Sequence, residues 1–177
     1  YLTQQNEILS ELWVKHGVDS LTGNWDYKEN VLFGYAAGRA IESFYKFNLM
    51  ASDKVVAQFH EWQAGAGLLY LEETKLPIAT VLTTHATVIG RCLAGNNLPL
   101  YDAMDLYDGD EKARQLGVVA RHSIEKISAG KADAFTTVSE ITAKECAHFL
   151  KREVTVVTPN GFEDSFTPAS DAEYNDK

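Results

Sequence analysis

The chain has 177 residues, 45% of them hydrophobic and 11% aromatic, which is enough to bury the core of one globular domain. Its formal net charge is -9 and it has no clustered Lys/Arg stripe, which argues against a nucleic-acid partner because phosphate binding needs a basic surface. No apolar run approaches the roughly 20 residues of a membrane-spanning helix. We therefore expect a globular domain with small or neutral partners and no membrane segment.

Two helices are predicted at the start of the chain. Apolar residues recur three and four positions apart over residues 5–16 and again over residues 28–47, which is the period of an amphipathic helix. The polar stretch 19–24 between them has the composition of a turn. We expect Trp13, Trp25 and the other aromatic side chains of this region to lie in the core or against a neighbouring domain.

From residue 54 onward, short apolar runs alternate with amphipathic stretches. Strands are predicted over residues 55–59, 78–82, 134–138 and 154–157, and helices over residues 64–74, 87–94, 112–129 and 141–151. Ser139 is placed to cap the last helix, and Glu145 to support a second cap at Thr142. This alternation predicts βαβ units with right-handed crossovers, and so an α/β, Rossmann-like domain with a mainly parallel sheet flanked by helices.

The two cysteines indicate a reducing compartment. Cys92 and Cys146 fall in apolar-periodic stretches and neither belongs to a CxxC pair, so we expect free, buried thiols. Residues 1–7 carry no signal-peptide pattern. A cytoplasmic location is therefore expected.

Polar groups follow each of the four predicted strands. Residues 60–62 (His-Glu-Trp) follow the first, residues 83–87 (Thr-Thr-His-Ala-Thr) follow the second, Ser139 follows the third, and residues 158–161 (Thr-Pro-Asn-Gly) follow the fourth. Ligands of open α/β sheets bind outside the carboxyl ends of the strands. We therefore expect these groups to converge on one cleft. The irregular stretch 95–109 is also long enough to suggest a functional loop.

Each of these groups also has a purely structural explanation. His60 and His85 could satisfy backbone groups, Glu61 fits a charge at a helix N-terminus, Ser139 fits a cap, and Asn160 fits a turn. The presence of two histidines at one end of the sheet favours function. Residues 60–64 lack the second histidine of HExxH, and no Cys/His set has metal-ligand spacing, so no metal is expected.

Several segments together resemble the N-terminal domain of the eukaryotic-type glycogen synthases (glycosyltransferase family 3). They are residues 59–68 (FHEWQAGAGL), 76–80 (LPIAT), 83–87 with 90–91 (TTHAT and GR), 135–139 with 141–142 (FTTVS and IT) and 157–161 (VTPNG). Residues 11–13 and 30–35 are similar as well, so the resemblance extends to about residue 166. Residues 161–164 depart from the family pattern after Asn-Gly.

The resemblance implies a retaining glucosyltransferase with two Rossmann-like domains, the GT-B architecture, and no cofactor. Such enzymes transfer glucose from UDP-glucose to the nonreducing end of an α-1,4-glucan in the cleft between the domains. By this resemblance His85 and Arg91 are the catalytic candidates, contacting the donor glucose and the donor or acceptor region. His60, Glu61 and Asn160 would line the same cleft and bind substrate.

The resemblance also predicts the domain organisation. Residues 1–168 would form part of an N-terminal GT-B domain without its first strands and without the C-terminal domain, and residues 169–177 a disordered tail. We expect such a fragment to be inactive alone, with a homo-oligomer possible. The alternatives are an ADP-glucose-using starch or glycogen synthase, another GT-B transferase, or a non-catalytic carbohydrate-binding domain.

Overall fold

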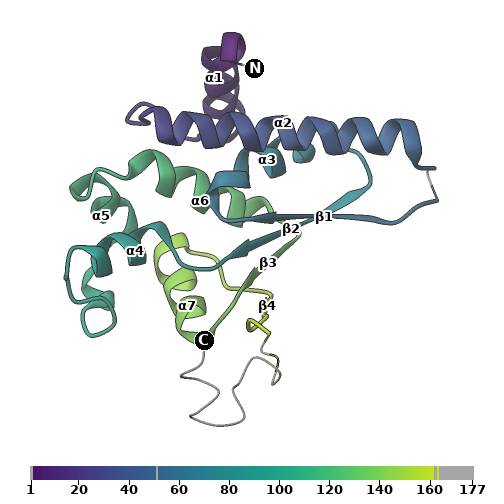
Figure 1. The fold of residues 1–177 in the computed structure, drawn as a ribbon. Helices are drawn as coiled ribbons and strands as arrows, with labels where there is room; N and C mark the ends of the chain where they lie inside the picture. The colour runs from purple at the N-terminus through teal and green to yellow at the C-terminus, as the bar shows by residue number, and fades with distance from the viewer. Residues whose placement is uncertain (1, 51, 162, 164–177) are drawn as a thin grey trace, which may run out of the picture.

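The structure, a computed structural model, describes residues 2–50, 52–161 and 163. It opens with a 3-10 turn (Leu2–Gln4) and the helices α1 (Gln5–His16) and α2 (Trp25–Asn48). Figure 1 shows α2 as a long rod across the domain, with α1 crossing it. Helices α3 (Gly65–Thr74), α4 (Val88–Gly95), α5 (Gly109–Gln115), α6 (Val119–Lys131) and α7 (Glu140–Glu145) follow, with 3-10 turns at Trp62–Ala64 and Met104–Leu106.

The strands form one parallel sheet in the described part of the chain. They are β1 (Val55–His60), β2 (Ile78–Thr84), β3 (Ala134–Thr137) and β4 (Val156–Val157), and they lie in the order β1-β2-β3-β4. Each neighbouring pair is parallel. The predicted α/β, Rossmann-like fold is therefore confirmed, although β2 extends two residues beyond its predicted end and β4 is shorter than predicted.

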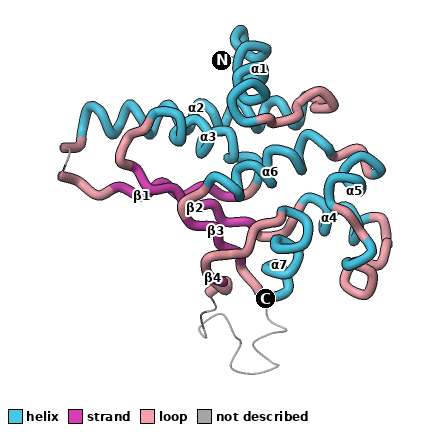
Figure 2. Tube along the Cα trace, turned by 180° about the vertical axis from the view of Figure 1, so that it is seen from behind, coloured by secondary structure: helices cyan, strands magenta, loops and turns pink. Residues whose placement is uncertain are grey.

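The helices that connect the strands pack on one face of the sheet. The strands follow one another in sequence order and parallel crossovers are right-handed, so every connection returns on the same side. Figures 1 and 2 show α3, α6 and α7 on that side. The side chains of Phe59, Leu82 and Phe135 lie in register on this face and are at most 3% exposed. His60 and Val56 alternate with Phe59 along β1 and are exposed.

Glycines allow α3 to approach both α2 and the sheet. A Cβ on Gly38 would lie 2.7 Å from the carbonyl oxygen of Gly67, and a Cβ on Gly67 would overlap the carbonyl oxygen of Gly34. The same Cβ on Gly67 would lie 2.8 Å from the ring of Phe59. Only residues without a side chain permit this packing distance, so the small residues of α3 have a structural purpose.

Two helix boundaries differ from the sequence prediction because of local capping. Helix α2 begins at Trp25 because the Asn24 side chain accepts the backbone N–H of Tyr27 at 3.1 Å. The single helix predicted over residues 112–129 is wrong. It is divided into α5 and α6 at Gly117, whose φ of +69° is a left-handed conformation.

The last predicted helix is only partly regular. The Ser139 hydroxyl accepts the backbone N–H of Thr142 at 3.2 Å, which confirms the predicted cap. After α7 the chain continues as one π-helical turn, Cys146–Leu150. The predicted role of Glu145 at a second cap is wrong, because its buried carboxylate accepts hydrogen bonds from the side chains of Thr87 and Tyr101 instead.

The aromatic residues near the start of the chain divide into two groups. Tyr27 is 1% exposed and stacks on the ring of Trp62 with centroids 5.9 Å apart. Trp13 and Trp25, in contrast, are 55% and 54% exposed. A core position is therefore wrong for these two tryptophans, and their packing against a neighbouring domain stays a prediction.

The remaining expectations concern thiols, membrane helices and the tail. Both cysteines are free, Cys146 buried and Cys92 partly exposed. No helix of the described residues is both long and apolar enough to cross a bilayer. The predicted tail, residues 169–177, lies outside the described residues.

Candidate functional site

Two histidines meet at the carboxyl edge of the sheet. His60 is the last residue of β1 and is paired in register with Thr83, while His85 directly follows β2. His60 Nδ1 lies 3.2 Å from His85 Nε2. One of these nitrogens must donate and the other accept, so the two rings keep this contact only while at least one is neutral. His60 is exposed and His85 partly exposed, so both can meet a ligand from solvent.

Glu61 connects the two strand ends. Its backbone N–H donates to the carbonyl of Thr83 at 2.9 Å, which extends the β1–β2 ladder by one bond. Its carboxylate Oε1 accepts the backbone N–H of His85 at 2.9 Å and lies 3.5 Å from Arg91 Nη2. The Glu61 backbone has φ 61° and ψ 172°, a conformation normally limited to glycine. Such strain persists where the surrounding structure requires a particular side-chain direction.

Helix α4 places Arg91 beside this group. Thr87 caps the helix, its hydroxyl accepting the backbone N–H of Gly90 at 2.9 Å. Arg91 lies in the first turn, with its side chain 63% exposed, and among the described residues its one ion pair is the weak pairing to Glu61. Its guanidinium is thus available to an anionic ligand.

Two carboxyl groups are buried behind α4: Glu125, which the sequence analysis did not single out, and Glu145, for which it predicted only a helix cap. Glu125 of α6 is 0% exposed, and both of its carboxyl oxygens accept from the backbone N–H of Val88, at 3.0 and 3.2 Å. Burial raises the pKa of Glu125 to about 8. Glu145 is 4% exposed. The one available signal was positional, because residue 125 falls within the buried stripe of α6 that contains Ile124, Ser128 and Ala129.

The third and fourth strand-end groups contribute differently. Ser139 acts as the helix cap described above. The backbone N–H of Thr158 donates to the carbonyl of Thr137 at 2.7 Å, which keeps the chain on the sheet just before Asn160. Asn160 is exposed, and no hydrogen bond joins it to the histidines within the described residues. The structure thus brings His60, Glu61, His85 and Arg91 together, and leaves Asn160 exposed after β4, with no hydrogen bond to these four among the described residues.

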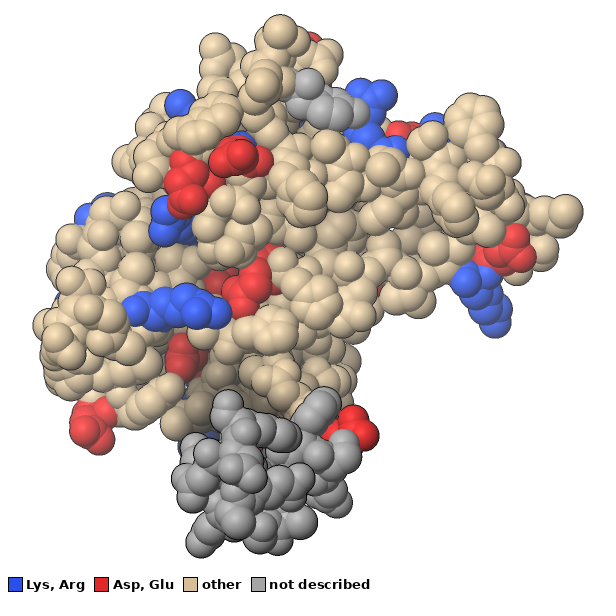
Figure 3. Space-filling view, in the orientation of Figure 1, with Lys and Arg blue, Asp and Glu red and all other residues tan. Residues whose placement is uncertain are grey.

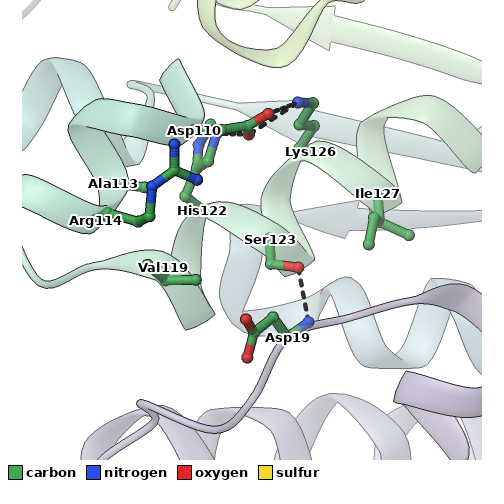
Figure 4. A pocket seen from close by; sticks show the side chains of 9 residues that line it. All are labelled: Asp19, Asp110, Ala113, Arg114, Val119, His122, Ser123, Lys126 and Ile127. Carbon is green, nitrogen blue, oxygen red and sulfur yellow. Dashed lines mark hydrogen bonds and ion pairs between the residues drawn. The ribbon is translucent and has the colours of Figure 1, made fainter. Parts of the chain in front are cut away.

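Several cavities of the described residues lie away from this edge. One of about 330 Å³ lies between α5, α6 and the loop after α1, and Figure 4 shows Asp110 there beside the ring of His122 and the amine of Lys126. Asp110 Oδ1 is 3.1 Å from His122 Nε2, and Asp110 pairs with Lys126 at 2.7 Å. None of the predicted site residues lines this cavity. We call His60, Glu61, His85 and Arg91 the strand-end group; His60 and the Arg91 side chain are exposed, and Glu61 and His85 are partly exposed.

Acidic and basic side chains are mixed on the face of the molecule that carries α4 and α7 in the orientation of Figure 1. On the face drawn in Figure 3, acidic and basic side chains are interspersed, without a continuous basic area. Within the described residues, no three His, Cys, Asp or Glu side chains are grouped closely enough to hold a metal ion. The expected independence of catalysis from metal stays a prediction.

Comparison with known proteins places the chain in a family. The family model for glycogen synthase matches residues 2–169. The chain is 43% identical over 146 residues to glycogen [starch] synthase of Dictyostelium discoideum, covering 82% of this chain and 16% of that protein. It is 53% identical over 107 residues to the liver glycogen [starch] synthase of Mus musculus, covering 60% and 15%.

A third relative, glycogen [starch] synthase isoform 2 of Saccharomyces cerevisiae, is 36% identical over 157 residues, covering 88% of this chain and 22% of that protein. The chain therefore spans between about a seventh and a fifth of the length of these curated relatives. The family model covers nearly all of the chain, and it does so over the segments that carry the strand-end group. The chain belongs to the glycogen synthase family.

Proposed function

We propose that this chain is part of the N-terminal domain of a retaining glucosyltransferase that extends an α-1,4-glucan at its nonreducing end. The donor is a nucleotide sugar, with UDP-glucose favoured, and the protein acts in the cytoplasm. The observation that carries the proposal is the convergence of His60, Glu61, His85 and Arg91 at one sheet edge, in a chain of the glycogen synthase family.

The chemistry of glucosyl transfer accounts for this set of side chains. The transition state has oxocarbenium character and a departing diphosphate, so it is stabilised by neutral hydrogen-bonding groups near the sugar and positive charge near the phosphates. The imidazole of His85 is the hydrogen-bonding group beside the donor glucose, and His60 orients this imidazole through the 3.2 Å contact. Arg91 provides the positive charge. We assign Asn160 to the sugar side of the cleft.

The remainder of the site would come from a longer polypeptide. The strand-end group is open to solvent, and β1 is the edge strand of the described sheet. We propose that further strands of the same domain pair with β1, that residues 1–168 are part of this domain, and that a second Rossmann-like domain closes the cleft. An unpaired edge strand also favours association between copies of the isolated chain.

The test is glucose transfer by the full-length protein that contains this chain. Labelled UDP-glucose and glycogen are supplied, and His85→Ala and Arg91→Ala are each expected to lower kcat by at least about 100-fold. Arg114→Ala is the matched control, because Arg114 is an exposed arginine of α5 outside the strand-end group. Its activity should equal that of the wild type.

The outcomes separate this proposal from its alternatives. Transfer from ADP-glucose in preference to UDP-glucose would assign the other synthase class, and glycogen binding without transfer would indicate a carbohydrate-binding domain. Near-wild-type rates in both the His85 and the Arg91 variant would overturn the site assignment. Turnover by the isolated 177-residue chain would overturn the two-domain proposal, since we expect it to be inactive.

A further inference from the structure

A chain of buried hydrogen bonds ends at the helix that carries Arg91. Oε2 of Glu145 accepts the hydroxyl of Thr87 at 2.8 Å, and that hydroxyl oxygen accepts the backbone N–H of Gly90 at 2.9 Å. Thr87 is 0% exposed and Glu145 is 4% exposed. The first turn of α4 is therefore fixed from inside the domain by a residue of α7, 58 positions away in the sequence.

The other oxygen of the same carboxylate holds the irregular segment 96–108. Oε1 of Glu145 accepts the hydroxyl of Tyr101 at 2.9 Å. Half of Tyr101 is exposed, so its ring lies at the surface while its hydroxyl reaches inward. One buried side chain thus connects α4 to the only long segment without regular strands or long helices in the described residues.

Burial of a carboxyl group such as that of Glu145 has an unfavourable free energy. A buried carboxylate is destabilising unless hydrogen bonds or ion pairs compensate it. Glu145 has two hydroxyl donors and no ion-pair partner among the described residues. If the position served packing alone, an apolar side chain of similar volume would avoid the cost of burying two polar oxygens. The geometry therefore points to a requirement for the two hydrogen bonds.

The absence of a side chain at Gly90 leaves room for the carboxylate of Glu145. A Cβ at residue 90 would overlap Oε2 of Glu145 and would lie 2.8 Å from Oγ1 of Thr87. Glycine within a helix costs about 0.5–1 kcal/mol relative to alanine, so its presence in the first turn needs such a reason. These contacts make the residue type at position 90 depend on the side chains of Glu145 and Thr87.

The same first turn determines where the site residues lie. Thr87 is two residues after His85, and the backbone N–H of Arg91 donates to the carbonyl of Thr87 at 3.0 Å. The N–H of Val88 is held separately by Glu125. A displacement of the Thr87 backbone would therefore shift His85 and Arg91 together.

We propose that Glu145 is a positioning residue of the glucosyltransferase site, which orients His85 and Arg91 through Thr87 and connects the segment 96–108 to the first turn of α4 through Tyr101. The proposal rests on the function proposed above. Glu145 has no contact with the substrate in this assignment. It sets the geometry of His85 and Arg91, which do contact the substrate. A displacement of about 1 Å in such residues can lower the rate on the order of 100-fold.

The experiment compares four variants of the full-length protein in donor and acceptor kinetics and in amide hydrogen exchange. Thr87→Val and Glu145→Gln are expected to lower kcat/KM for UDP-glucose by about 10-fold to 100-fold, with the KM for glycogen unchanged. Thr87→Ser keeps both hydrogen bonds of the hydroxyl and should stay within about twofold of the wild type. The amide of Gly90 should exchange faster in the first two variants only, because its acceptor is lost or turned away.

Tyr107→Phe is the matched control. Tyr107 lies in the same irregular region and its hydroxyl donates to the carbonyl of Pro99 at 2.8 Å, without contact to Glu145. The Phe variant should therefore keep both wild-type kinetics and wild-type exchange. Thermal unfolding of each variant shows which remain folded at the assay temperature, and the Gly90 amide is read in those.

Each outcome decides the proposal. Unchanged donor kcat/KM in folded Thr87→Val and Glu145→Gln proteins overturns it, as does an equal loss in Thr87→Ser or in the Tyr107 control. If the wild type transfers no glucose at all, the proposed function is wrong. The Gly90 amide then decides separately whether Glu145 fixes α4, since exchange needs no activity.

Discussion

The backbone N–H of His85 donates to the carboxylate of Glu61 at 2.9 Å, and Glu61 makes this contact from the strained conformation φ 61°, ψ 172°. A residue other than glycine in this region costs on the order of 1–3 kcal/mol. The two residues follow adjacent parallel strands, so the strain is located where two strand ends meet. We interpret it as the cost of directing a carboxylate at the segment that contains His85 and Arg91.

Replacement of Glu61 by glycine and by alanine should measure this strain. Both variants lose the carboxylate, but only glycine adopts the observed backbone conformation without cost. Glu61→Gly is therefore expected to be more stable than Glu61→Ala by about 1–2 kcal/mol, measured by urea unfolding of the chain. At an unstrained position glycine would be the less stable of the two, and that order would show that the strain is absent.

Gly90→Ala should destabilise the chain although alanine is the better helix former. The added Cβ would overlap the carboxylate of Glu145, and we expect a loss of about 1–3 kcal/mol. Gly95→Ala is the control on the same helix, because a Cβ at Gly95 meets nothing within 4 Å. It should be neutral or stabilising by up to about 1 kcal/mol.

The double variant Gly90→Ala/Glu145→Ala separates steric overlap from a general effect of residue 90. With the carboxylate removed, the added methyl group should cost less than it does in the wild type, so the two changes should be non-additive. Additive losses would mean that Gly90 is required for some reason other than Glu145.

The stability of the chain should depend on pH through Glu125. Burial raises its pKa from an ordinary 4.5 to about 8 in the folded chain. Between these values the folded state holds a proton that the unfolded state has lost, so this contribution to stability is complete below about pH 4.5 and declines as pH rises toward 8. The decline is at most about 1.4 kcal/mol per pH unit.

Glu125→Gln removes the titration and leaves a neutral side chain of similar shape. The difference in unfolding free energy between wild type and variant should therefore move in favour of the variant from pH 5 to pH 8, as measured by urea unfolding at each pH. A constant difference across this range would mean that Glu125 is ionised in the folded chain at neutral pH.

Glucose transfer by the full-length protein should be independent of divalent metal. The described residues contain no grouped set of metal ligands, and Arg91 provides a positive charge that can replace a metal ion at the diphosphate. Activity should be unchanged after treatment with a chelator. Loss of activity that one divalent ion restores would contradict this prediction.

The sequence alone predicted the parallel α/β sheet and the meeting of two strand-end histidines. Alternating apolar runs and amphipathic stretches predict βαβ units, and parallel strands must end at one edge. For this reason His60 and His85, 25 positions apart, could be expected to meet, and their rings do. Ser139 and its helix cap were equally predictable, because a cap depends on a few consecutive residues.

Only the tertiary structure decided which polar and aromatic side chains are buried. Glu125 and Glu145 are charged residue types that are seldom buried, yet both are buried here, whereas Trp13 and Trp25, for which a core position was one expectation, are more than half exposed. Burial depends on what packs against a helix face, and local pattern does not specify that partner. The strained backbone of Glu61 belongs to the same class, because contacts with His85 and Arg91 hold it in a conformation that its own sequence disfavours.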